Sequence, residues 1–209
     1  MNEPLMAASD DDLIRLVDPR PGHFALESGD HGDLWLDLNR PFLTPHAVAP
    51  FASRLAERLS AIAFDVVCGP FAGGAFLARM IAFELAVPFC MTERLIQGRS
   101  QIASNSARRL IRYRLPEDMR DVVAAKRITV IDDAINAGHA VGGTIAALRA
   151  SGAEPVVVGA LLVLEAAGRS RAVLNGLPLM TLVTLPSARW RADACPLCAE
   201  GVMLGHPER

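Results

Sequence analysis

Stretches with apolar residues at helical spacing alternate along this chain with short, almost continuous apolar runs. The helical spacing is clearest in residues 46–62, where Val48, Phe51, Leu55 and Leu59 fall on one face. Such spacing predicts helices over 10–17, 46–62, 75–85 and 141–150. The apolar runs predict strands over 24–26, 34–37, 65–68, 87–91, 127–131, 156–164 and 179–185.

This alternation of strands and helices is typical of an α/β protein whose mostly parallel central sheet is flanked by helices. The run 156–164 is apolar almost throughout and therefore predicts a central strand. We find no internal repeat and no low-complexity linker, so we expect one domain over residues 1–209. Ligands of such open sheets lie beyond the carboxyl ends of the strands.

Composition and charge narrow the classes of function. A formal net charge of -2 and the lack of a long basic face argue against nucleic acid as the main partner. No apolar run is long enough to cross a membrane, and the acidic start lacks the pattern of a signal peptide. We therefore expect a cytoplasmic protein with no nucleic-acid or membrane partner.

Residues 128–140 carry the strongest chemical signal. A predicted strand leads into Asp132 and Asp133, and Gly138 precedes a helical pattern from His139 to Leu148. Two carboxylates can hold sugar hydroxyls or a hydrated magnesium ion, and the amides at the helix start can hold a phosphate. A ribose 5-phosphate meets both requirements, whereas the alternative is a strand–helix unit without a ligand.

This stretch resembles the signature of the type I phosphoribosyltransferases, which bind 5-phosphoribosyl 1-diphosphate (PRPP). The resemblance implies the fold of that family, with a core of about 45–164 and a small hood from about 1–44 and 165–209. It implies that Asp132 and Asp133 contact the ribose and that Mg²⁺ is held near them through PRPP and water. The 5-phosphate would lie against Asn136, Ala137, Gly138, His139 and Ala140.

A second loop, Gly69 to Gly74, resembles the diphosphate loop of the same family. Small residues such as Ala72 and Gly73 allow close approach of a diphosphate to the backbone, although glycine-rich turns also occur for packing reasons alone. Arg94 follows the next predicted strand and can pair with diphosphate oxygens as a third catalytic residue, the alternative being a solvated arginine.

Four segments resemble one branch of the family, the orotate phosphoribosyltransferases. They are residues 22–33, 65–74, 92–94 and 195–202, which span nearly the whole chain in order. The resemblance implies transfer from PRPP to orotate, a homodimer, and a base site that includes Asn136, Ser28 and the position of Ala166.

The chain departs from that branch at three places. The predicted mobile loop 93–109 has arginines where a lysine is usual, Ala166 stands where an arginine usually holds the carboxylate of the base, and Glu27 replaces a common lysine. These departures leave two alternatives open. One is transfer to another nucleobase, and the other is a PRPP- or nucleotide-binding regulatory protein without catalysis.

Cys195 and Cys198 have the spacing of half a zinc site. A structural zinc ion needs about four ligands, and one pair supplies two. His206 is one possible further ligand, and the pattern favours a packed tail over a metal site. Cys68 and Cys90 lie in apolar runs and are predicted to be reduced core residues.

Overall fold

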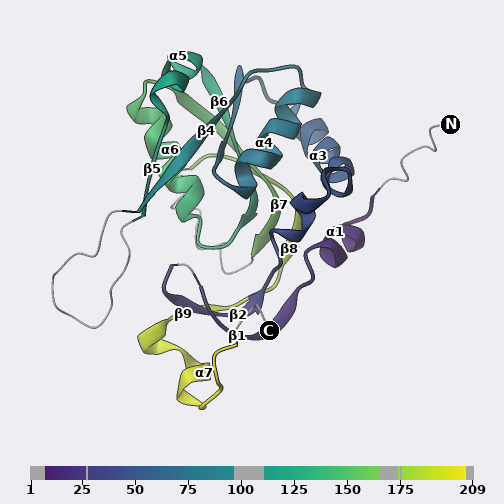
Figure 1. Cartoon of the computed structure of the whole chain (residues 1–209), viewed down its shortest axis with the longest axis vertical. Coiled ribbons are helices and arrows are strands. Elements are labelled where there is room, and N and C mark those ends of the chain that lie inside the picture. Colours follow the sequence, from purple (N-terminus) through teal and green to yellow (C-terminus); the bar gives the residue numbers. More distant parts are fainter. Residues whose placement is uncertain (1–7, 27, 97–110, 165–173, 175, 206–209) are drawn as a thin grey trace.

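The computed structural model describes residues 8–26, 28–96, 111–164, 174 and 176–205. A six-stranded sheet forms the centre of the molecule, and all but one of its neighbouring strand pairs are parallel (Figure 1). In spatial order its strands are β5 (Ile111–Arg114), β4 (Phe89–Ile96), β3 (Val66–Pro70), β6 (Arg127–Ile135), β7 (Glu154–Leu164) and β8 (Leu179–Leu185). The mostly parallel α/β sheet predicted from the sequence is therefore confirmed.

Helices cover both faces of this sheet. The helices α1 (Asp10–Leu16), α3 (Pro45–Leu59) and α4 (Gly73–Glu84) share one buried apolar cluster with the sheet, whereas α6 (His139–Ala150) and α5 (Arg120–Val123) share a second. Leu55 and Ile145 are fully buried, one in each cluster. Full burial of such side chains contributes roughly 1.5–3 kcal/mol each, so the sheet is a rigid platform for residues at its edge.

Two strands extend further than the sequence predicts. β6 continues past Ile131 to Ile135, so Asp132 and Asp133 lie within the strand, because its pairing with β7 continues to Ile135 opposite Val163. β4 likewise continues to Ile96, so the prediction of a mobile loop starting at residue 93 is wrong for residues 93–96. Residues 97–109 of that predicted loop lie outside the described part of the chain.

The extension of β4 is stabilised by a strand that the sequence analysis missed. β5 pairs with it in the antiparallel direction, and the Arg114 side chain forms an ion pair with Glu93 at 3.0 Å. β5 is only four residues long and half exposed. Its alternation of apolar and polar residues is too short to predict a strand within an arginine-rich stretch.

A smaller antiparallel sheet lies at the end of the core where β6 passes into α6 (Figure 1). It consists of β1 (Arg20–Ala25), β2 (Asp30–Trp35) and β9 (Arg189–Arg191), followed by the short helix α7 (Pro196–Ala199). We call this sheet with α7 the hood. Two elements expected in the hood belong to the core instead, because α1 buries Leu13 in the core and β8 pairs with β7.

The remaining elements are one-turn helices. They are α2 (Arg40–Leu43), and the 3-10 turns at Glu117–Met119 and Ala192–Ala194. Among the described residues, no helix is long and apolar enough to cross a membrane.

Candidate functional site

The two acids of the signature lie side by side near the carboxyl end of β6. Asp132 is 6% exposed and Asp133 is half-buried. The backbone N–H of Asp133 donates to Asp132 Oδ1 at 3.1 Å, and the N–H of Ala134 donates to Asp133 Oδ1 at 2.9 Å. These bonds fix the two carboxylates in place before any ligand binds.

Burial raises the pKa values of both acids. Removal from water raises the pKa of Asp132 well above its ordinary value, and the neighbouring charge of Asp133 raises it further. Burial also raises the pKa of Asp133. Two carboxylates held together in this way are stabilised by hydroxyl donors or by a cation, which are the groups that a ribose and hydrated magnesium would bring.

The acid pair packs against the start of α4. A Cβ atom added to Gly73 would lie 2.1 Å from Asp133 Oδ2, and one added to Gly74 would lie 2.6 Å from Asp132 Oδ1. Any side chain at either position would therefore push a carboxylate aside. Both acids also gain from the positive end of the α4 dipole. Gly73 and Gly74 are therefore needed for packing against the acids, in addition to the expected close approach of a diphosphate to the backbone of this loop.

The predicted 5-phosphate loop turns sharply from β6 into α6. Gly138 is buried and has a left-handed φ of 73°, a conformation that glycine adopts without steric cost. The helix begins at His139, where the helical pattern of the signature begins, and the His139 side chain is exposed. The N–H groups at this helix start are oriented for an anion, and Asn136, Ala137 and Ala140 flank them at intermediate exposure.

The loop after β3 is tied to β4 and through it to α6. The Phe71 N–H donates to the Thr92 carbonyl at 2.9 Å, and the Thr92 and Thr144 hydroxyls share a buried hydrogen bond at 2.7 Å. Ala72 is exposed in this loop. Arg94 is half-buried and lies within β4, two residues past Thr92, where the sequence placed it in a loop.

The base half of the expected site is described only at two of its positions. Ser28 lies in the turn between β1 and β2, where its Oγ accepts a hydrogen bond from the Asp30 N–H at 3.3 Å. Asn136 lies at the start of the phosphate loop. Ala166, Glu27 and the arginines of the segment 97–109 lie outside the described residues.

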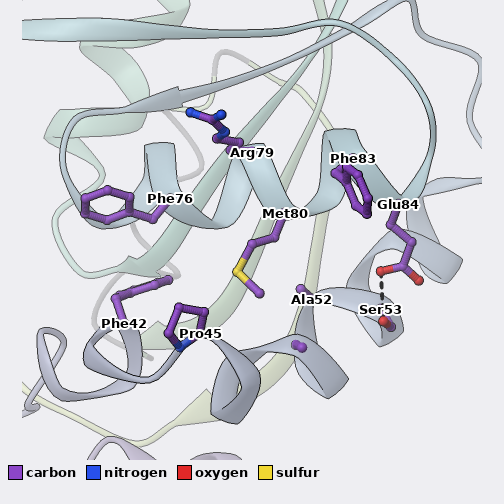
Figure 2. A pocket seen from close by; sticks show the side chains of 10 residues that line it. Phe42, Pro45, Ala52, Ser53, Phe76, Arg79, Met80, Phe83 and Glu84 are labelled. Carbon is purple, nitrogen blue, oxygen red and sulfur yellow. Dashed lines mark hydrogen bonds between the residues drawn. The ribbon is translucent and has the colours of Figure 1, made fainter.

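The structure also contains an apolar groove. It has a volume of about 710 Å³ between α2, α3 and α4, and Figure 2 shows Phe42, Phe76 and Met80 facing into it. At one end the Ser53 hydroxyl donates to Glu84 at 2.8 Å. Its lining has little to hold a sugar phosphate, and the sequence analysis did not anticipate it.

The structure also brings together a polar cluster that the sequence analysis missed. His23 and His31 of the hairpin β1–β2 lie against Cys195 and Cys198, with one nitrogen or sulfur atom from each within 4.8 Å of the others. The sequence analysis considered only His206 as a further ligand beside the cysteines, and His206 lies outside the described residues. The distance of His23 and His31 from the cysteines along the chain hid their relation.

The architecture defines a class of protein. The structure is similar to adenine phosphoribosyltransferase from Thermoanaerobacter pseudethanolicus, with a TM-score of 0.65 and 16% identity over 84% of this chain and 99% of the other. It is also similar to orotate phosphoribosyltransferase from Mycobacterium tuberculosis, with a TM-score of 0.59 and 20% identity over 84% and 93%. The chain therefore has the type I phosphoribosyltransferase fold, as the sequence predicted.

Sequence comparison points to one branch of that class. The chain is 29% identical over 187 residues to orotate phosphoribosyltransferase from Caldanaerobacter subterraneus, which covers 89% of this chain and 88% of the relative. It is 27% identical to the enzyme of the same name from Thermotoga maritima, over 89% of each chain. No protein-family model matches the chain. The predicted resemblance to a divergent orotate phosphoribosyltransferase is confirmed.

Proposed function

We propose that this chain transfers the 5-phosphoribosyl group of PRPP to orotate. A ring nitrogen of orotate loses its proton and forms a bond to C1 of the ribose, while the bond from C1 to the diphosphate oxygen breaks. The products are orotidine 5′-phosphate and pyrophosphate. The similarity to orotate phosphoribosyltransferases over 89% of the chain is the observation that carries this proposal.

The acid pair would stabilise the sugar as the bond to C1 breaks. Glycosyl transfers pass through a transition state with positive charge on the sugar ring. In the proposed complex, Asp132 and Asp133 accept hydrogen bonds from the ribose hydroxyls, and their negative charge lies beside that developing positive charge. Burial alone disfavours the ionised form of Asp132, which is why its pKa is raised. Hydrogen bonds donated by the ribose hydroxyls would favour the ionised form, so substrate binding would restore the negative charge.

Magnesium fits the donors of this site. Mg²⁺ prefers oxygen ligands and usually keeps several waters while it bridges one or two carboxylates and substrate phosphates. Asp132 and Asp133 supply such oxygens at the edge of the sheet, and bound magnesium would neutralise charge on the diphosphate. We place it near the pair through water and PRPP, without direct protein ligands.

The diphosphate would lie between the loop after β3 and the end of β4. In this proposal Ala72 and Gly73 approach it with their backbone, and the planar guanidinium of Arg94 pairs with its oxygens. The 5-phosphate would bind at the N-terminus of α6, over residues 136–140. Binding at two helix starts would hold the ribose between them, with C1 towards the hood. Ser28 of the hood and Asn136 of the phosphate loop would then face the base.

The identity of the base can be tested by comparing the rate of pyrophosphate release for several bases. Ala166 replaces the arginine expected for the carboxylate of orotate, and a hydrogen bond to a charged group is worth about 1.5–3 kcal/mol. Pyrophosphate release should be measured with PRPP and orotate, uracil, adenine or no base. We expect release with orotate above all others. Preference for another base would assign that base, and PRPP binding without release for any base would indicate a regulatory protein.

We also propose that the chain is a homodimer that associates through the apolar groove. Phe83 and Phe76 both line the groove and are 90% and 51% exposed, which is unusual for a face that stays in water. Light scattering of the purified chain should give twice the mass of one chain. The substitution Phe83→Asp should shift the mass towards that of one chain, whereas Arg15→Ala on the exposed end of α1 should not.

A cytoplasmic location completes the proposal. Cys68 and Cys90 are buried as free thiols on neighbouring strands. A hydrogen bond from the Cys68 thiol to Cys90, together with burial, raises the pKa of Cys68. Unreactive core thiols of this kind support a reducing compartment.

A further inference from the structure

We propose that His23, His31, Cys195 and Cys198 form a tetrahedral site for one structural zinc ion that fastens the C-terminal tail to the hood. This site is separate from the proposed PRPP site and does not depend on it. The observation behind the proposal is the convergence of two nitrogen and two sulfur atoms within 4.8 Å of one another, from segments about 170 residues apart in sequence.

Four of the six separations between these atoms lie close to those around one zinc ion. His23 Nε2 lies 3.0 Å from His31 Nδ1, 3.4 Å from Cys195 Sγ and 3.7 Å from Cys198 Sγ, and the last sulfur lies 3.3 Å from His31 Nδ1. Zinc bonds of about 2.0–2.1 Å to nitrogen and 2.3 Å to sulfur, at tetrahedral angles, separate neighbouring ligand atoms by about 3.3–3.8 Å. The three nitrogen–sulfur separations fall in this range, and the nitrogen–nitrogen separation is about 0.3 Å shorter than its lower end.

The orientation of His23 is already that of a metal ligand. Its Nδ1 lies 2.8 Å from the Val202 carbonyl, which can only accept, so Nδ1 carries the proton and Nε2 presents a lone pair. A carbonyl behind the ring is the usual second partner of a zinc-bound histidine. Hydrogen bonding alone does not explain the cluster, because one lone pair cannot serve His31, Cys195 and Cys198 together.

The described part of the tail buries few of its side chains. Within residues 192–205, Cys195 is buried and Leu197 is half-buried, whereas the other residues are exposed, including Met203 at 88%. The tail lies along β1 through the Gly205 N–H, which donates to the His23 carbonyl at 2.6 Å. A segment without an apolar core commonly depends on a metal for its structure, since metal binding supplies the free energy of folding.

The ligand set selects zinc among the metals. Tetrahedral sites with two sulfur and two nitrogen donors suit zinc or iron–sulfur chemistry. A two-iron cluster with the same residues divides them between two separated irons, whereas all four atoms here surround one point. Cys198 is exposed, which gives the ion a path from solvent. All four positions hold protein atoms, so the site is closed and structural.

The first test is the metal content of the purified full-length chain, prepared under reducing conditions and dialysed against zinc and then metal-free buffer. We expect about one zinc ion per chain, and less than about a tenth of that in Cys198→Ser and His31→Ala. Two matched controls should keep the ion. They are Cys90→Ala, a buried thiol in the core, and His46→Ala, an exposed histidine on α3.

A second measurement on the unsubstituted chain keeps the proposal testable if a variant fails to fold. Cobalt(II) exchanged into the site should give the visible absorption of tetrahedral cobalt together with a thiolate charge-transfer band. Zinc content near zero, octahedral cobalt, or a native mass lower by two hydrogen atoms, which indicates a Cys195–Cys198 disulfide, would overturn the proposal.

Discussion

The acid pair and the cysteine–histidine cluster both hold polar groups in place, but they are supported in opposite ways. Asp132 sits on a strand whose neighbours β3 and β7 are buried almost throughout, so apolar packing fixes its position. Cys198 sits on a four-residue helix that buries no residue. Apolar packing in the core can therefore hold buried carboxylates whose ionised form is disfavoured, whereas in the proposed zinc site the polar groups themselves hold the tail of the hood in place.

The largest expected effect comes from removing charge at the acid pair. We expect the double substitution Asp132→Asn, Asp133→Asn to lower kcat/KM by at least about 10³-fold, because it removes the negative charge beside the developing sugar cation. The free energy of unfolding should not fall, since the substitutions remove two carboxyl groups whose ionised form is disfavoured by burial. Steady-state kinetics and urea unfolding test both halves of this prediction.

The matched control for the acid pair is Asp65→Asn. The Asp65 carboxylate accepts a hydrogen bond from the Arg127 N–H at 2.8 Å at the opposite end of the sheet, so its loss should leave kcat/KM unchanged. Near-normal turnover in the double variant, or equal losses in both, would remove the acid pair from the proposed mechanism.

The next effect tests the packing of α4 against the acids. Gly73→Ala places a methyl group where Asp133 Oδ2 now lies, so we expect a loss of roughly 10–100-fold in kcat/KM from misplaced carboxylates. Gly152→Ala is the control. It has a left-handed φ of 76° and open space around it, so it should cost about 1–2 kcal/mol of stability and leave the kinetics unchanged. Similar kinetics in the two variants would contradict this account.

A third effect should be confined to the hood. If zinc fastens the tail, chelation should allow trypsin to cut after the exposed Arg191 while the core stays intact. Mass spectrometry of a timed digest would show a fragment ending at Arg191 only in the chelated protein. Equal cleavage with and without chelator would mean that the cluster does not hold the tail, and simultaneous loss of the core would mean that the two regions unfold together.

The smallest effect concerns pH. Burial raises the pKa of Asp132, so at a pH above the ordinary carboxyl pKa the folded chain still binds a proton that the unfolded chain has released. The free energy of unfolding should therefore fall as pH rises from about 4 to 7 in the absence of ligands, by about 1.4 kcal/mol for each unit through which the pKa is raised. Asp132→Asn should flatten this dependence in urea titrations, and a wild-type curve that rises over the same range would contradict the assigned cause.

Sequence reasoning succeeded where local pattern and structure coincide. The order of the core strands and helices follows from apolar periodicity. Gly138 lies in the predicted turn before α6, whereas Asp132 and Asp133 lie within β6, because pairing with β7 extends that strand to Ile135. It failed where distant segments meet. β5 is defined by its pairing with β4, and the partners of Cys195 lie on β1 and β2, so neither could be found from spacing along the chain.

The central claim is that the acid pair and its loops serve phosphoribosyl transfer to orotate. The most direct measurement is the formation of orotidine 5′-phosphate, followed by mass spectrometry, from orotate, PRPP, Mg²⁺ and the purified chain. We expect one orotidine 5′-phosphate for each pyrophosphate released, and loss of both in the Asp132→Asn, Asp133→Asn variant. Pyrophosphate release without orotidine 5′-phosphate, or no consumption of PRPP by a folded chain, would contradict the claim.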